Sequence, residues 1–177
     1  MKVLNLYFSS TGNTEKIARQ IEKAALEAGH EAETVLVTKD TEVDILAYDF
    51  VFIGSGVHTW LPPKTMMDFL KQTRERYGEL GEIKPKSPRR LGKRAVVYSS
   101  FGGGHTGVNE AVPAVKYMGQ LFDHLGYEIL SEWYFVGEFQ GRLQHLSTTG
   151  RLGNIQGRPN EADLRDVYER VMGILEV

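Results

Sequence analysis

The sequence contains no cysteine and no long hydrophobic run. Without cysteine, disulfides, thiolate metal sites, iron–sulfur clusters and thiol catalysis are excluded. The composition also suits a reducing compartment, so we expect a cytoplasmic location. No apolar run approaches the ~20 residues that a transmembrane helix needs. We therefore expect no membrane span.

A basic excess is also missing. The chain has 21 Lys and Arg against 23 Asp and Glu, with a net charge of −2. Proteins that bind nucleic acid usually neutralise its phosphates with an excess of cations. Nucleic acid is therefore not an expected partner. A length of 177 residues suits one domain that buries about 70% of the surface of its unfolded chain, so we expect residues 1–177 to form a single domain.

The most informative segment is the beginning of the chain, where an apolar run over residues 3–8 meets a hydroxyl-rich loop and then a helical pattern. A buried strand that ends in this way leaves backbone amides unpaired at the start of the next helix, where the helix dipole favours an anion. Gly12 lets the chain turn tightly. The loop has no Lys or Arg, so one phosphate monoester fits it better than a nucleoside triphosphate. The residues that we expect to hold this phosphate are Ser9, Ser10, Thr11, Gly12, Asn13 and Thr14.

Strand and helix patterns alternate along the rest of the chain. The apolar runs predict strands at residues 3–8, 31–37, 50–54, 94–99 and 127–135, and helical spacing predicts helices at 17–28, 63–77, 112–125 and 160–175. This alternation predicts an α/β fold, a doubly wound five-stranded parallel sheet in the order 2-1-3-4-5 between two helical layers. In that order, ligands bind where the loops after the first, third and fourth strands meet.

The loops after the third and fourth strands contain residues that suit a flat ring system. Trp60 lies in a Gly-rich loop at the predicted ligand edge, where it could stack on a ring. A run of three glycines after the fourth strand would let backbone amides approach the edge of a heterocycle, and Phe101 could supply a second aromatic face. The candidate ligand residues are Ser55, Gly56, Val57, His58, Thr59 and Trp60 in one loop, and Ser99, Ser100, Phe101, Gly102, Gly103, Gly104 and His105 in the other.

Other interpretations of these loops remain open. The hydroxyl-rich loop could be an ordinary helix start, Trp60 could pack on Phe69, and the two histidines could simply face solvent. Gly102, Gly104 and Gly107 also match a dinucleotide-binding pattern, but they follow the fourth strand rather than the first. Neither loop contains Asp or Glu. A bound redox group would therefore gain negative charge more easily here than beside carboxylates.

The string Tyr7-Phe8-Ser9-Ser10-Thr11-Gly12-Asn13-Thr14, followed by Glu15-Lys16-Ile17-Ala18, resembles the signature of flavodoxins. The resemblance implies flavin mononucleotide (FMN) as cofactor, with its phosphate on residues 9–14 and its ring near Trp60 and Phe101. It also implies a flavodoxin-like electron-transfer protein that moves electrons between a reductase and an acceptor. The flavin would carry the chemistry, so neither a catalytic side chain nor a metal is expected. Flavodoxins are typically strongly acidic, and the balanced charge of this chain departs from that pattern.

Two further functions compete with an electron carrier. One is an FMN-dependent NAD(P)H:quinone-type oxidoreductase, which the balanced charge would suit; a related form would resemble the flavodoxin-like protoporphyrinogen oxidases. The other is a binding module that uses the same fold without flavin.

Two further segments of the sequence are unusual. Residues 84–94 hold six cations, which could dock an acidic partner or a nicotinamide phosphate, or could form a solvated connector. Residues 138–158 are long, Gly-rich and without periodicity, which is typical of functional or mobile loops. This second segment could cover the flavin or form a homodimer contact, with Arg142, His145 and Arg151 as candidate contacts.

Overall fold

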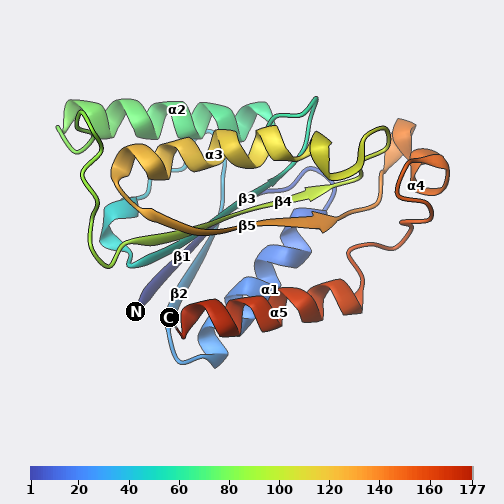
Figure 1. Cartoon of the computed structure of the whole chain (residues 1–177), viewed down its shortest axis with the longest axis horizontal. Coiled ribbons are helices and arrows are strands. Elements are labelled where there is room, and N and C mark those ends of the chain that lie inside the picture. Colours follow the sequence, from blue (N-terminus) through green and yellow to red (C-terminus); the bar gives the residue numbers. More distant parts are fainter. Residues whose placement is uncertain (177) are drawn as a thin grey trace.

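A computed structural model describes residues 1–176 and shows a parallel sheet between two layers of helices (Figure 1). The order of the strands is β2-β1-β3-β4-β5, and all neighbouring pairs are parallel. The predicted topology is therefore confirmed. The strands are β1 (Lys2–Phe8), β2 (Glu31–Leu36), β3 (Phe50–Gly56), β4 (Arg94–Phe101) and β5 (Glu128–Val136).

Four long helices cover the sheet, two on each face. The helices α2 (Lys64–Glu79) and α3 (Val112–Leu125) lie on one face, whereas α1 (Asn13–Glu27) and α5 (Glu161–Leu175) lie on the other (Figure 1). A one-turn helix, α4 (Leu146–Thr149), belongs to the segment between β5 and α5. The sheet thus separates two apolar cores, which explains why its central strands are uniformly apolar.

Local signals in the sequence account for several helix ends. Gly126 ends α3 in the left-handed conformation, with φ of 78°. Asn160 caps α5 and forms a capping box with Asp163. No helix within residues 1–176 is both long and apolar enough to cross a membrane.

A buried polar contact ties the central strands together. The Tyr98 hydroxyl of β4 donates to Asn5 Oδ1 of β1 at 3.0 Å, and Asn5 Nδ2 donates to the Ala18 carbonyl of α1 at 2.9 Å. The Tyr98 ring passes over Gly54 of the intervening strand, where an added Cβ would lie 2.1 Å from the ring. Burial raises the pKa of Tyr98, so its phenol stays an uncharged donor.

Two strands are longer than predicted. β3 continues to Gly56 and β4 to Phe101, because Ser55 pairs with Ser99 in the ladder and the Ser99 hydroxyl donates to the Ser55 carbonyl at 3.0 Å. The prediction that Ser55, Gly56, Ser100 and Phe101 lie in loops is therefore wrong, whereas Ser99, the last residue of the predicted strand 94–99, lies in β4. Ser55 and Ser99 are buried in the sheet, where their hydroxyl groups donate to backbone carbonyls.

Two of the six cations of residues 84–94, Arg90 and Lys93, are bonded to the rest of the fold. The Arg90 guanidinium donates to the Leu125 carbonyl at 2.9 Å and to the Glu82 carboxylate, and Lys93 Nζ donates to the Tyr48 carbonyl at 2.9 Å. These contacts favour the connector hypothesis over a docking site.

Candidate functional site

Two adjoining cavities lie at the carboxyl ends of β1, β3 and β4, where the strand order predicts a ligand site. Their volumes are about 210 and 170 Å³. The first lies beside the loop after β1, and the second lies beside Trp60. Val57, Phe101 and Gly102 line both. The two cavities therefore form one elongated site with two chemically different ends.

The first end is a cradle of backbone amides at the start of α1. Gly12 has φ of 87°, and its amide donates to Ser9 Oγ at 3.0 Å, which folds the loop back on itself. The first hydrogen bond of α1 runs from the Lys16 amide to the Gly12 carbonyl. Within residues 1–176, five amides around this turn donate no hydrogen bond, those of Ser10, Thr11, Asn13, Thr14 and Glu15. Such a group of amides at a helix start attracts an anion.

Two hydroxyl groups of the cradle connect it to the neighbouring strands. Thr14 Oγ1 and Ser100 Oγ are 2.8 Å apart and both residues are buried. Ser10 Oγ and His58 Nε2 are 3.4 Å apart at the surface. Thr14 is thus held in place, whereas Ser10 remains exposed beside a histidine.

One buried polar atom in the cradle has no partner. Asn13 Nδ2 donates to the Glu138 carbonyl at 2.9 Å, but Asn13 Oδ1 is buried and accepts no hydrogen bond. An unpaired buried acceptor is costly unless a bound group satisfies it. A phosphate on the amides, with a hydroxylated chain that donates to Asn13 Oδ1, fits these residues. FMN has both groups.

The second end is built around a strained turn. His58 and Leu61 exchange two backbone hydrogen bonds, of 2.8 and 3.1 Å, and the two residues between them have positive φ, 49° at Thr59 and 67° at Trp60. A β-branched or bulky residue rarely adopts this conformation. Trp60 is 60% exposed, so the structure does not support the alternative in which it packs on Phe69. The turn presents the indole at the second cavity.

The loop after β4 is held by a carboxylate that sequence analysis missed. Glu110 Oε1 accepts from the amides of His105 and Thr106, each at 2.6 Å, and Glu110 lines the second cavity. Gly103 is needed in this loop, since its φ is 56° and an added Cβ would lie 2.8 Å from the backbone of Gly107. The loops themselves hold no Asp or Glu, but Glu110 brings a carboxylate to the second cavity from the turn that follows. Glu110 escaped notice because it follows the loop rather than belonging to it.

The segment between β5 and α5 supplies the remaining wall. The Phe139 ring covers Gly102, where an added Cβ would lie 2.3 Å from it. Gln140 Nε2 donates to the Thr11 carbonyl at 2.9 Å, and Ser147 is buried and bonded to the backbone of Phe139. The segment was recognisable in the sequence by its length and glycine content, but these contacts were not. Its lining residues are Gly137, Glu138, Phe139, Gln140, Leu143 and Leu146.

The structure brings most of the predicted ligand residues to the two cavities. The first is lined by Ser10, Thr11, Asn13, Thr14, Gly56, Val57, His58, Ser100, Phe101 and Gly102, and the second adds Thr59, Trp60, Gly103 and His105. The predicted residues that line neither cavity are Ser9, Gly12, Ser55, Ser99 and Gly104. Ser9, Gly12 and Gly104 belong to the loops, and Ser55 and Ser99 lie in β3 and β4.

The candidate contacts of the long segment lie outside both cavities. Arg142, His145 and Arg151 are exposed. Among residues 1–176, no three His, Asp or Glu side chains are grouped so that they could hold a metal ion.

Comparison with known proteins agrees with this fold. Residues 4–80 match the family model of the flavodoxin domain. Flavodoxin 2 from Bacillus cereus is 19% identical, with a TM-score of 0.70 over 99% of both chains, and flavodoxin 1 from the same organism is 18% identical, with a TM-score of 0.69 over 99% of this chain and 98% of that one. A Cys-to-Ser variant of a Pseudomonas aeruginosa flavodoxin is 16% identical, with a TM-score of 0.68 over 99% and 97%. The resemblance seen in the sequence is confirmed, and the fold is shared along the whole chain.

Proposed function

We propose that this chain, whose fold is that of the flavodoxins, binds FMN and carries electrons between a reductase and an acceptor protein. The observation that supports this most directly is the cradle. Five unpaired amides and an unpaired buried Asn13 Oδ1 lie at one end of a site whose other end holds an exposed Trp60. We also propose that the chain works as one domain in the cytoplasm, in keeping with its lack of cysteine.

In this proposal the residues of the cradle bind the cofactor by its phosphate. The five free amides, those of Ser10, Thr11, Asn13, Thr14 and Glu15, donate to the phosphate, and the dipole of α1 favours its charge. No Lys or Arg lines either cavity, so these neutral donors carry most of the recognition. Asn13 Oδ1 accepts from the chain that joins the phosphate to the ring.

The residues at the other end orient the ring and limit its contact with water. Trp60 stacks on it, and Phe139 with the glycines of residues 102–104 closes the opposite side. When bound, FMN supplies the redox chemistry. Glu110 places negative charge at this end and opposes the uptake of further negative charge.

A flavin titration tests the proposal. Purified protein freed of ligand should bind FMN in a 1:1 ratio, with loss of flavin fluorescence, and should bind riboflavin, which lacks the phosphate, at least about 100-fold more weakly. Equal affinity for the two flavins, or no binding of either, would contradict it. Anaerobic reduction of the loaded protein then shows whether the bound flavin exchanges electrons.

A second function, direct oxidation of NAD(P)H with reduction of a quinone, has one observation in its favour. The side chains of Arg142 and Arg151 are exposed on the segment that walls the site and form no ion pair within residues 1–176. They could bind the phosphates of a nicotinamide nucleotide. Steady-state turnover of NADPH with a soluble quinone, lost in the double variant Arg142→Gln and Arg151→Gln, would establish it. A carrier would show no such turnover but would be reduced rapidly by a partner reductase.

A further inference from the structure

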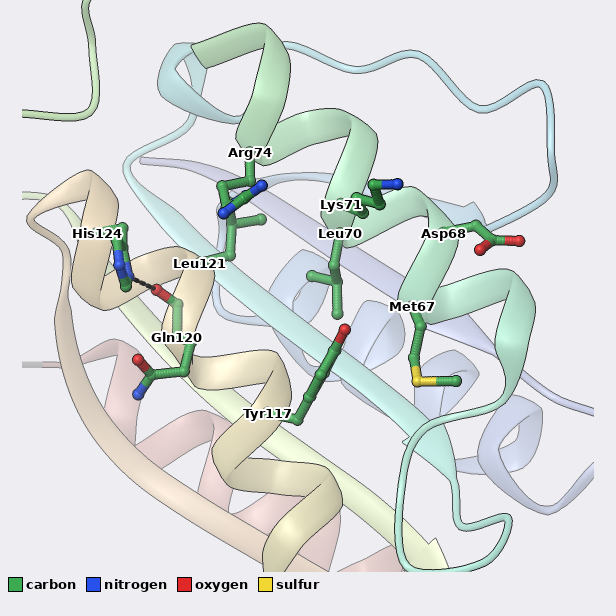
Figure 2. Close-up of a pocket in the computed structure, with 9 residues that line it drawn as sticks. All are labelled: Met67, Asp68, Leu70, Lys71, Arg74, Tyr117, Gln120, Leu121 and His124. Atoms are coloured by element: carbon green, nitrogen blue, oxygen red, sulfur yellow. Dashed lines mark hydrogen bonds between the residues drawn. The ribbon is translucent and has the colours of Figure 1, made fainter. Parts of the chain in front are cut away.

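A third cavity lies in the groove between α2 and α3 and shares no lining residue with the two cavities of the candidate site. Its volume is about 420 Å³, which is larger than either cavity of the candidate site. The floor is formed by Leu70 and Leu121, both buried, and Met67 and Tyr117 form its sides. Figure 2 shows the Tyr117 ring lying across the groove between the two helices. The groove is therefore apolar at its base and aromatic at one end.

The lining residues follow the same spacing on both helices. On α2 they are Met67, Leu70, Lys71 and Arg74, with Asp68 as one further lining residue, and on α3 they are Tyr117, Gln120, Leu121 and His124. Positions i, i+3, i+4 and i+7 share one face of a helix. Each set spans seven residue steps, about 10 Å of helix. This length suits a small molecule with two fused rings, whereas a docked helix of several turns would need a longer groove.

Donors without acceptors surround the other end of the groove. In Figure 2 the side chains of Arg74 and His124 face each other across it. Arg74 makes only a 3.8 Å contact with Glu75, and Lys71 has no partner within residues 1–176. The Tyr117 hydroxyl is also unpaired in this part of the chain. The groove therefore offers several N–H and O–H groups and a positive charge.

The one carboxylate in the lining does not cancel this charge. Asp68 Oδ2 lies 2.6 Å from Lys64 Nζ, one turn earlier on α2. Figure 2 shows Asp68 directed away from the centre of the groove. His124 Nδ1 lies 2.6 Å from the Gln120 carbonyl, which leaves Nε2 as the ring nitrogen able to meet a ligand. Figure 2 shows Lys71 Nζ also directed away from α3, so the charge that faces the groove is that of Arg74.

We infer that this groove is a second ligand site, for a small aromatic carboxylate. The ring system lies between Met67 and Tyr117 over the two leucines, and the carboxylate binds the Arg74 guanidinium. The site is separate from the cavities at the strand ends, and it does not depend on the proposed function.

The test uses 2-naphthoate as the probe and protein saturated with FMN, so that the cavities at the strand ends cannot take up the probe. In ¹H–¹⁵N NMR spectra, a titration should shift the amides of residues 67–74 and 117–124 and reach saturation with Kd in roughly the 0.1–1 mM range. Naphthalene-2-methanol, which has the same rings without the charge, should bind at least about 10-fold more weakly. If the protein does not retain FMN, the titration is run on the ligand-free chain, and the location of the shifts still decides the outcome.

Single substitutions on the solvent side of the groove complete the test. Arg74→Gln should raise Kd about 10-fold, and Tyr117→Phe, which removes only the hydroxyl, about 3-fold. Both side chains are exposed, so folding should be preserved. Arg165→Gln, an exposed arginine of α5 on the opposite face of the sheet, is the matched control and should leave Kd unchanged. Shifts centred on residues 9–14 or 57–61, equal affinity for the alcohol, or equal effects of Arg74→Gln and Arg165→Gln would overturn the inference.

Discussion

The two ends of the candidate site are built in opposite ways. At the cradle, the left-handed position is occupied by Gly12, where an added Cβ would meet nothing within 4 Å, and the free amides are held by the first turn of a long helix. At the turn beside the second cavity, Thr59 and Trp60 occupy left-handed positions themselves, and Trp60 is mostly exposed. The cradle is relaxed and preorganised, whereas the turn is strained.

This difference suggests that the two ends have different roles in the proposed binding of FMN. A preorganised set of donors gives affinity at low entropic cost, so the cradle should determine how tightly the flavin binds. Strain at a functional site persists only where the surrounding structure holds it. The turn should therefore determine the environment of the ring. Four experiments test this difference and the anchoring of the segment that walls the site.

The largest effect is expected from Thr14→Val. This change removes a buried hydroxyl from the cradle, and a hydrogen bond that supports a charged group contributes about 1.5–3 kcal/mol. We expect Kd for FMN to rise about 10- to 100-fold in a fluorescence titration, with little change for riboflavin. Thr34→Val in β2 is the control, since the Thr34 hydroxyl is buried without a partner and far from the site. Equal losses for the two flavins would show that Thr14 does not act on the phosphate.

A smaller effect, about 10-fold, is expected from Trp60→Ala, and it should be the same for FMN and riboflavin because both carry the ring. Trp60→Phe should retain most of the affinity. Because Trp60 is 60% exposed in the free protein, its loss should hardly change the free energy of unfolding. A loss confined to FMN would remove the distinction between the two ends.

Next come two substitutions that should change stability in opposite directions. Gly12→Ala places a Cβ on a residue with φ of 87° and should lower the free energy of unfolding by about 1 kcal/mol. Thr59→Gly relieves a β-branched residue at φ of 49° and should raise it by about 0.5–1 kcal/mol. Urea unfolding of the ligand-free proteins measures both. If Thr59→Gly destabilises the chain, the turn is not strained.

The smallest effect concerns the anchor of the wall segment. The hydrogen bonds from Arg158 hold the pKa of Asp163 below its ordinary value of 3.8. A depressed carboxyl pKa contributes stability above the ordinary value and loses it as the pH falls. Asp163→Ala should therefore cost about 1 kcal/mol at pH 7, since Arg158 is partly exposed to water. The difference from the unmodified protein should shrink below about pH 4.

The matched control for this pair is Asp166→Ala. Its partner Arg170 lies one turn away on α5 at 2.9 Å, and both side chains are about half exposed. We expect a cost below about 0.5 kcal/mol. Equal costs for the two variants would mean that the Arg158 pair does not anchor the segment.

Most of the fold could be predicted because its signals are local. The apolar runs of the central strands, Gly126 after α3 and the Asn160 cap of α5 each determine structure within a few residues. The ends of β3 at Gly56 and of β4 at Phe101 were missed because the preceding serines, Ser55 and Ser100, satisfy their hydroxyl groups within the fold. The sequence alone does not distinguish a serine at the end of a strand from a serine in a loop.

The site was only partly predictable. Topology brings three loops together, and this could be derived from the order of the strands. The contacts of Phe139 with Gly102 and of Gln140 with Thr11 join residues far apart in the chain, and no local pattern marks them. The position of Glu110 depends on how its short helical turn folds back on the preceding loop. Such contacts follow from tertiary packing.

The Tyr98 hydroxyl is hydrogen-bonded to Asn5 Oδ1, and its ring lies over Gly54. This contact helps to fix the position of β1 relative to β4. Both strands lead into the site, one to the amide cradle and the other to the glycine loop. The distance between the two ends of the site therefore depends on a hydrogen bond in the interior, made by a phenol that lines neither of the two cavities. Gly54→Ala would be expected to separate these strands and to misalign both ends at once, while every residue of the pocket kept its identity.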